Sequence, residues 1–93
     1  MIKSFRGKVA EALFNGSCPK GFPSTVAKRA RRKLEMVEAA AALSDLEVPP
    51  GNHLEALKGD RKGQHSIRIN DQWRVCFKWN KAEASDVEVV DYH

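Results

Sequence analysis

Apolar residues follow two different spacings along the chain. Between residue 25 and about residue 43 they recur every three or four positions, which keeps them on one face of a helix. From residue 64 onward they alternate with polar residues, the spacing of a half-buried strand. The change of period predicts a helical first half and a β-rich second half.

The first half begins with two short elements and a loop. Residues 2–5 could form a short strand, and residues 8–14 have the pattern of a short helix. Asn15 and Gly16 would end that helix in a left-handed turn. Residues 17–23 contain Pro19, Gly21 and Pro23, which indicates a loop.

Ser24 is placed to act as the N-cap of the main helix, over residues 25 to about 43. The expected buried face consists of Val26, Ala30, Leu34, Val37 and Ala41. The opposite side carries Lys28, Arg29, Arg31, Arg32 and Glu35. We therefore expect this helix to lie across a sheet with its basic side outward, and to end before the proline-rich residues 44–52.

The second half predicts an antiparallel meander: strands over residues 64–69, 73–79 and 86–90, joined by a turn at 70–72 and a polar loop at 80–85. In the middle strand, Trp73, Val75, Phe77 and Trp79 share the face expected to join the core, and Arg74, Cys76 and Lys78 share the other. Helices followed by such a meander predict an α+β fold of two layers.

Length, charge and cysteine content narrow the function. Ninety-three residues suffice for one domain, over residues 1–93, and favour a surface site over an enclosed pocket. No apolar run approaches the roughly 20 residues that cross a bilayer, and no signal-peptide pattern opens the chain, so a cytoplasmic protein is expected. The net charge of +4 is consistent with a polyanionic partner. Cys18 and Cys76 have no metal-ligand spacing and are expected to be ordinary thiols, so no metal site is predicted.

Reactive side chains gather in three places: residues 55–61, Arg74, and the terminal Asp91, Tyr92 and His93. In an antiparallel meander the end of one strand lies beside the start of the previous one, so Arg74 and the C-terminal residues can be neighbours. RNA can be cut without a metal when a base takes the 2′-OH proton, a cation stabilises the phosphate charge and an acid protonates the leaving oxygen. His93 can serve as base or acid, since imidazole titrates near pH ~6.5. The available cations are Lys58, Arg61 and Arg74.

The sequence Leu-Lys-Gly-Asp-Arg-Lys-Gly at residues 57–63, the Trp73-Arg74 pair and the terminal Asp91-Tyr92-His93 resemble the HigB-type toxins of the RelE/ParE superfamily. The resemblance covers nearly the whole chain. It implies a ribosome-dependent messenger RNA endonuclease from a bacterial type II toxin-antitoxin system, acting without a cofactor. It also implies a microbial-ribonuclease-like fold, with two N-terminal helices on a small, mostly antiparallel sheet. The implied partners are the ribosome and a helix-turn-helix antitoxin, with which the toxin would form a heterotetramer.

The resemblance carries catalytic roles to Lys58, Arg74, Asp91, Tyr92 and His93. Some well-studied members have a histidine three residues before the lysine, where this chain has Glu55. His53 lies two residues earlier and would share a side with residue 55 if both lay on a strand. The acid/base work could therefore fall to Glu55, to His53 or more heavily to His93.

The remaining cations are candidates for binding RNA or the ribosome. Arg61, Lys62 and Arg68 lie close to the expected catalytic residues in sequence, and Lys28, Arg29, Arg31 and Arg32 lie on the main helix. The helical cluster could be a solvated face, a contact for ribosomal RNA or a docking surface for the antitoxin. An alternative from a different class is a non-catalytic member that acts by binding its antitoxin, as a co-repressor, or another target such as gyrase. The Glu55 substitution motivates this alternative.

Overall fold

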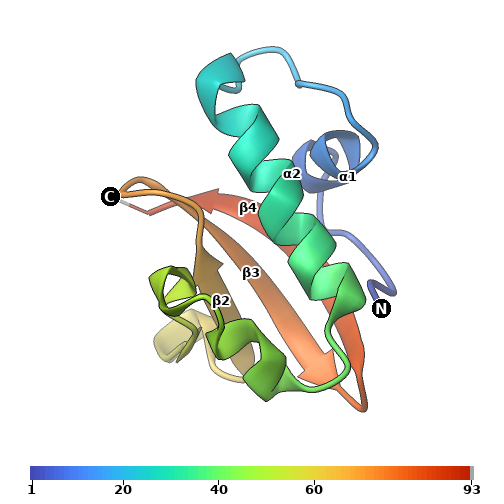
Figure 1. The fold of residues 1–93 in the computed structure, drawn as a ribbon, viewed down its shortest axis with the longest axis vertical. Coiled ribbons are helices and arrows are strands. Elements are labelled where there is room, and N and C mark those ends of the chain that lie inside the picture. Colours follow the sequence, from blue (N-terminus) through green and yellow to red (C-terminus); the bar gives the residue numbers. More distant parts are fainter. Residues whose placement is uncertain (93) are drawn as a thin grey trace.

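The computed structural model describes residues 1–92 and has two layers, with helices α1 and α2 on one face of a twisted sheet (Figure 1). The elements are α1 (Val9–Phe14), α2 (Ser24–Ala39), β1 (Glu55–Ala56), β2 (Gln64–Arg68), β3 (Trp73–Asn80) and β4 (Glu83–Asp91). Three short 3₁₀ helices, η1 (Leu43–Glu47), η2 (Pro50–Asn52) and η3 (Gly59–Arg61), join α2 to the sheet. All neighbouring strands are antiparallel, in the order β1-β2-β3-β4. The predicted α+β class and the meander are confirmed, and β1 is an additional strand that the sequence pattern did not predict.

The N-terminal segment runs along the outer side of β4. Ile2 and Phe5 form isolated parallel bridges to Ala84 and Val87, so the short strand considered for residues 2–5 is reduced to two bridges. The Ser4 hydroxyl accepts a hydrogen bond from the Asp86 N–H, where β4 is irregular, and a continuous ladder does not form.

Helix α1 ends as predicted, with Gly16 in the left-handed region at φ +92°. The prediction that Ser24 is an N-cap is wrong. Ser24 is the first residue of α2, and Pro23 precedes it in an extended conformation. The Pro23 carbonyl accepts hydrogen bonds from Val26 and Ala27, which begins the helix without a side-chain cap.

Helix α2 also ends about four residues earlier than predicted. Ala40 is extended, and the Asp45 carboxylate accepts hydrogen bonds from the N–H groups of Ala41 and Ala42. These bonds start η1 in place of another turn of α2. As a result Ala40 is buried, whereas Ala41, expected on the buried face, is exposed.

The core lies between the helices and one face of the sheet. Leu34 and Val37 of α2 pack with Val75 and Phe77 of β3, all fully buried. Trp73 and Trp79 pack against the same cluster, which confirms the predicted apolar face of the middle strand. The opposite face of the sheet is therefore free to carry polar side chains.

Strand β4 begins at Glu83, three residues before the predicted start. Lys81 and Ala82 form a two-residue turn, with φ of +48° and +67°. Such turns usually contain Asn or Gly. Because neither stands at these two positions, the sequence predicted a longer loop.

A β-bulge near Asp86 sets which side chains of β4 face away from the helices. Asp86 has φ +50°, and the register shifts between the Lys78–Ser85 and Cys76–Glu88 pairs. One extra residue moves every later side chain to the opposite face. Glu88, Val90 and Tyr92 consequently project from the open face.

Candidate active site on the open face of the sheet

The open face, the side of the sheet opposite α1 and α2, gathers polar side chains from three adjacent strands. Ser66 pairs with Cys76, and Cys76 pairs with Glu88. Arg74 pairs with Val90 next along the same strands. The open face includes Glu55, Gln64, Ser66, Arg68, Arg74, Cys76, Lys78, Glu88, Val90 and Tyr92.

Arg74 is the most constrained cation of this face, since its side chain is only 12% exposed. Its Nε donates to the Ser66 hydroxyl at 2.8 Å, and Nη2 donates to the His53 carbonyl at 2.7 Å. Nη2 also lies 3.5 Å from Glu55 Oε1. These contacts hold the planar guanidinium in one orientation.

Tyr92 lies beside Arg74, with the guanidinium carbon 5.9 Å from the ring centroid. The expected proximity of Arg74 to the C-terminal residues is thus confirmed, because Trp73 pairs with Asp91 at the same edge. Burial raises the pKa of the Tyr92 phenol, and Cys76 adds to the effect while Arg61 and Arg74 oppose it. The phenol is therefore protonated at neutral pH and can donate a hydrogen bond.

Arg61 reaches the same face from η3. Its Nη1 donates to Glu88 Oε1 at 2.6 Å and to Gln64 Oε1 at 3.1 Å. The hydrogen bond to Glu88 is the main cause that raises the pKa of Arg61. The Arg61–Glu88 ion pair is partly buried, with side chains 28% and 20% exposed.

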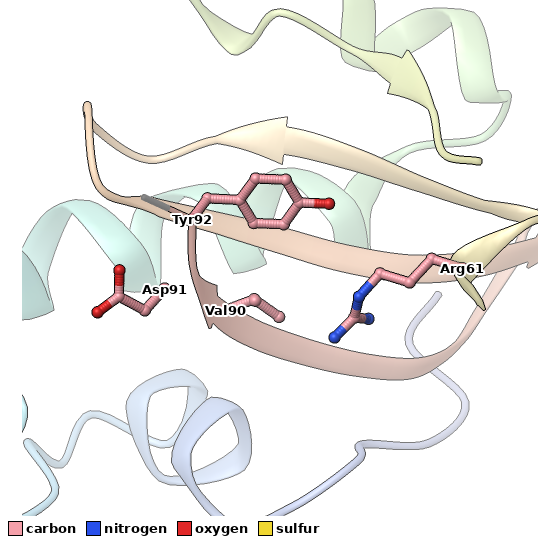
Figure 2. A pocket seen from close by; sticks show the side chains of 4 residues that line it. All are labelled: Arg61, Val90, Asp91 and Tyr92. Atoms are coloured by element: carbon pink, nitrogen blue, oxygen red, sulfur yellow. The ribbon is translucent and has the colours of Figure 1, made fainter. Parts of the chain in front are cut away.

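A shallow cavity of about 440 Å³ is lined by Arg61, Val90, Asp91 and Tyr92. Figure 2 shows the Arg61 side chain reaching toward Val90 and the Tyr92 ring extending toward Arg61. The Asp91 carboxylate points away from both. The cavity between the arginine and the ring is open to solvent.

Asp91 is still part of β4, and its carboxylate accepts a hydrogen bond from Gln72 Nε2 at 3.0 Å. Strand alternation therefore places the side chains of Asp91 and Tyr92 on opposite faces of the sheet. His93 lies outside the described residues.

His53 and Glu55 do not share a strand, so the condition under which His53 would lie on the same side as Glu55 is not met. His53 is the left-handed residue that ends η2, with φ +45°, while Glu55 is the first residue of β1. The exposed His53 contributes its backbone carbonyl to Arg74. Glu55 is the acidic group that the structure brings to Arg74.

The remaining cations predicted around the site lie at its margin. Lys58 precedes η3, and Lys58 and Lys62 are both exposed. Within residues 1–92, the Lys58 side chain has no hydrogen bond or ion pair, so it can move toward a ligand. Arg68 is paired with Asp71 in the β2–β3 turn.

The basic side of α2 faces away from the sheet, as predicted. Lys28, Arg29, Arg31 and Arg32 are exposed, and they belong to a different surface from the Arg74 site. Lys33 turns inward to donate to the buried Asn52 at 2.6 Å. Burial, with smaller effects of Arg29 and Arg32, lowers the pKa of Lys33.

Ser66 and Glu88, which hold the two arginines, were not among the residues predicted from the sequence. Ser66 could have been found from register, because it alternates with the buried Ile67. For Glu88 the signal was the three-residue spacing of Ala84 and Val87, both buried, which strict alternation forbids.

Residues 1–92 contain no cluster of three or more His, Cys, Asp or Glu side chains that could hold a metal ion. In the same residues, no helix has both the length and the apolar character needed to cross a membrane.

Helices on one face of an antiparallel sheet, with an open face that carries arginine and tyrosine, form the arrangement expected for a RelE-like toxin. A family model described as the RelE-like toxin HigB of type II toxin-antitoxin systems matches residues 3–93. The chain belongs to this HigB family.

Individual relatives agree. The protein named Endoribonuclease HigB from Proteus vulgaris is 32% identical over 93 residues, 100% of both chains. Toxin HigB-1 from Vibrio cholerae is 51% identical over 57 residues, 61% of this chain and 60% of that protein. An uncharacterized protein from Haemophilus influenzae is 38% identical over 65 residues, 70% of this chain and 64% of that protein. The matches thus span less than two thirds of the Vibrio and Haemophilus proteins and the full length of the Proteus protein.

Proposed function

We propose that this toxin is an endoribonuclease that cuts messenger RNA on the ribosome, without a metal ion, by attack of a 2′-OH on the adjacent phosphodiester. The observation that carries the proposal is the fixed guanidinium of Arg74, held by Ser66 and the His53 carbonyl beside the Tyr92 ring. A preorganised cation of this kind stabilises charge that develops on phosphate oxygens. The full-length match to a protein named Endoribonuclease HigB supports the same activity.

In this mechanism Arg74 binds the non-bridging oxygens of the scissile phosphate. Lys58, exposed on the loop before η3, adds a second positive charge from the side. Tyr92 orients the nucleotide through its ring and donates from its protonated phenol. Because the pKa of Tyr92 is raised, almost none of the phenolate that could act as a base is present at neutral pH.

Proton transfer is assigned to the other terminal residues and to Glu55. A base takes the 2′-OH proton and an acid returns one to the departing 5′-oxygen. Glu55 stands beside Arg74, so its carboxylate is within reach of a phosphate bound there. His93 is the other proton-transfer candidate. Asp91 is a weaker one because its carboxylate points away from Arg61 and Tyr92, and His53 is weaker because it ends η2 away from the strand.

The partners we propose are the ribosome with its message, in the cytoplasm, and a helix-turn-helix antitoxin. Family membership implies an antitoxin. We further propose a heterotetramer of two toxins and two antitoxins. Arg61, Lys62 and Arg68 surround the open face and would contact RNA, whereas the basic side of α2 offers a separate surface for ribosomal RNA.

Primer extension on a message in translating ribosomes tests the activity. Wild type should give discrete cuts that are absent without ribosomes. Arg74→Ala and His93→Ala should each lower the cleavage rate about 10²-fold or more, typical of losing a stabilising or acid/base group. Arg6→Ala, at the N-terminal segment, is the matched control and should cut as wild type does.

Two outcomes would contradict the proposal. If His93→Ala and deletion of residues 91–93 both left cleavage intact in folded protein, the assignment of the terminal residues would be wrong. Growth arrest that survived Arg74→Ala without any cleavage would instead favour a toxin that acts only by binding a protein.

A further inference from the structure

Arg61 is held on the open face in a way that leaves part of its guanidinium available. Both of its hydrogen bonds, to Glu88 and to Gln64, use Nη1. Within residues 1–92, Nε and Nη2 have no hydrogen-bond partner. Because a guanidinium has five N–H donors in a planar fork, an arginine fixed through one nitrogen can still bind an oxyanion through the others.

The position of Glu88 is unusual for a surface expected to meet RNA. A carboxylate there repels phosphate, and the half-buried guanidinium of Arg61 offsets that charge. Glu88 reaches this position only because of the bulge at Asp86. Its evident effect is to fix Arg61 against the cavity that Tyr92 lines.

The two arginines are anchored at the same level of the sheet, on either side of β3. Arg74 bonds to Ser66 on β2 and Arg61 bonds to Glu88 on β4. Ser66 and Glu88 both pair with Cys76 of β3. The Tyr92 ring centroid lies 5.9 Å from the guanidinium carbon of Arg74, and Tyr92 lines one cavity with Arg61.

We propose that Arg61 is a second phosphate-binding residue, which holds the phosphate next to the scissile one, and that Glu88 is its positioning residue. This inference rests on the proposed ribonuclease function. The nucleotide between the two phosphates would lie against Tyr92, in the cavity that Arg61 and Val90 also line. Glu88 touches no reacting atom in this arrangement and acts only through Arg61.

The test is a double-mutant cycle between Arg61 and single phosphates of the message. Messages carry one uncharged methylphosphonate linkage, placed on either the 5′ or the 3′ side of the cleaved linkage. Cleavage is measured as kcat/KM on programmed ribosomes. With wild type, one of these two substitutions should lower kcat/KM about 10- to 100-fold, the worth of a hydrogen bond to a charged group.

Arg61→Ala should cause a loss of the same size on the natural message and no further loss on that modified message. The comparison variant Arg74→Ala should show additive losses, because Arg74 binds the other phosphate. Additive losses for Arg61→Ala at both flanking linkages, with wild type still active, would overturn only the role of Arg61. Absence of cleavage by wild type would overturn the proposed function and this inference together.

Two variants of Glu88 separate positioning from proton transfer. Glu88→Gln keeps an oxygen that accepts a hydrogen bond from Arg61 Nη1. Its cleavage rate should therefore stay within about threefold of the wild-type rate, well short of the tenfold change that about 1.4 kcal/mol produces. Glu88→Ala should lose the coupling between Arg61 and the flanking phosphate. If Glu88→Gln lowered kcat 10²-fold or more, as loss of an acid/base group does, Glu88 would be a proton-transfer residue and the positioning role would be wrong.

Discussion

The Nε of Arg74 donates a hydrogen bond of 2.8 Å to the hydroxyl of Ser66, which joins the cation of the candidate site to the adjacent strand. Ser66 is fully buried, so this hydroxyl is shielded from water. A buried hydroxyl that accepts a hydrogen bond from a guanidinium fixes the orientation of the charged group. The orientation of Arg74 is therefore a property of the sheet, formed before any ligand arrives.

Ser66→Ala should lower the cleavage rate about 10-fold, because the loss of one hydrogen bond to a charged group removes about 1.5–3 kcal/mol and frees Arg74 to rotate. Single-turnover cleavage on programmed ribosomes measures the effect, and thermal unfolding reports any change in stability. Ser85→Ala, on β4 opposite Lys78, is the matched control. Equal losses for the two variants would show that the Ser66 hydroxyl does not position Arg74.

Replacing Tyr92 separates its ring from its hydroxyl. Tyr92→Phe keeps the aromatic face beside Arg74 and should retain cleavage within a few fold. Tyr92→Ala removes a stacking surface worth about 1–3 kcal/mol per base and should lower the rate about 10- to 100-fold. Cleavage rates of the two folded variants provide the comparison, and equal losses would assign the essential role to the hydroxyl instead.

Stability should fall in alkaline solution because of Cys76. Burial raises the pKa of this thiol in the folded state, so above about pH 8.5 the unfolded chain loses the proton first. The unfolded state then binds fewer protons, and the free energy of unfolding decreases as pH rises toward the folded-state pKa. Denaturant unfolding between pH 7 and 10 measures this slope.

Cys76→Ala should reduce that alkaline loss of stability, although it also removes a buried side chain and lowers stability at every pH. Cys18→Ala is the matched control, since Cys18 is an exposed thiol. An identical pH dependence in wild type and Cys76→Ala would contradict the assignment.

Charge reversal on α2 tests its basic face. Arg29→Glu with Arg32→Glu should leave the fold intact, since both side chains are exposed. Ribosome association should weaken, and the slope of log K against log salt should become shallower, by about one for each lost phosphate contact. Lys81→Glu, in the β3–β4 turn, is the control. Unchanged ribosome binding with loss of antitoxin binding would assign this face to the antitoxin.

The layer order and the core were predictable because residues 73–79 alternate strictly and the helix pattern has a regular period. The residues at which helices and strands begin and end were less predictable. Helix α2 stops where the Asp45 carboxylate captures two N–H groups, and β4 starts after a turn of Lys81 and Ala82. Both depend on local hydrogen bonding or backbone geometry that composition does not signal.

The candidate site was predictable to the extent that it follows from strand adjacency. Arg74 and Tyr92 meet because β3 and β4 are antiparallel neighbours. The contacts of Arg61 with Glu88 depend on a bulge, and the carbonyl of His53 reaches Arg74 through a left-handed residue. The pattern of polar and apolar residues does not signal a one-residue change of register or a single residue with an unusual φ.

The antiparallel meander has a consequence for how such a toxin can diversify. Every described residue of the candidate site, from His53 to Tyr92, belongs to one uninterrupted stretch of chain, whereas α1 and α2 cover the opposite face. The helices contribute their buried faces to the core and leave their outer faces free of any role in the site. Substitutions on the outer side of α2 can therefore redirect which macromolecule is engaged while the chemistry of the sheet stays as it is.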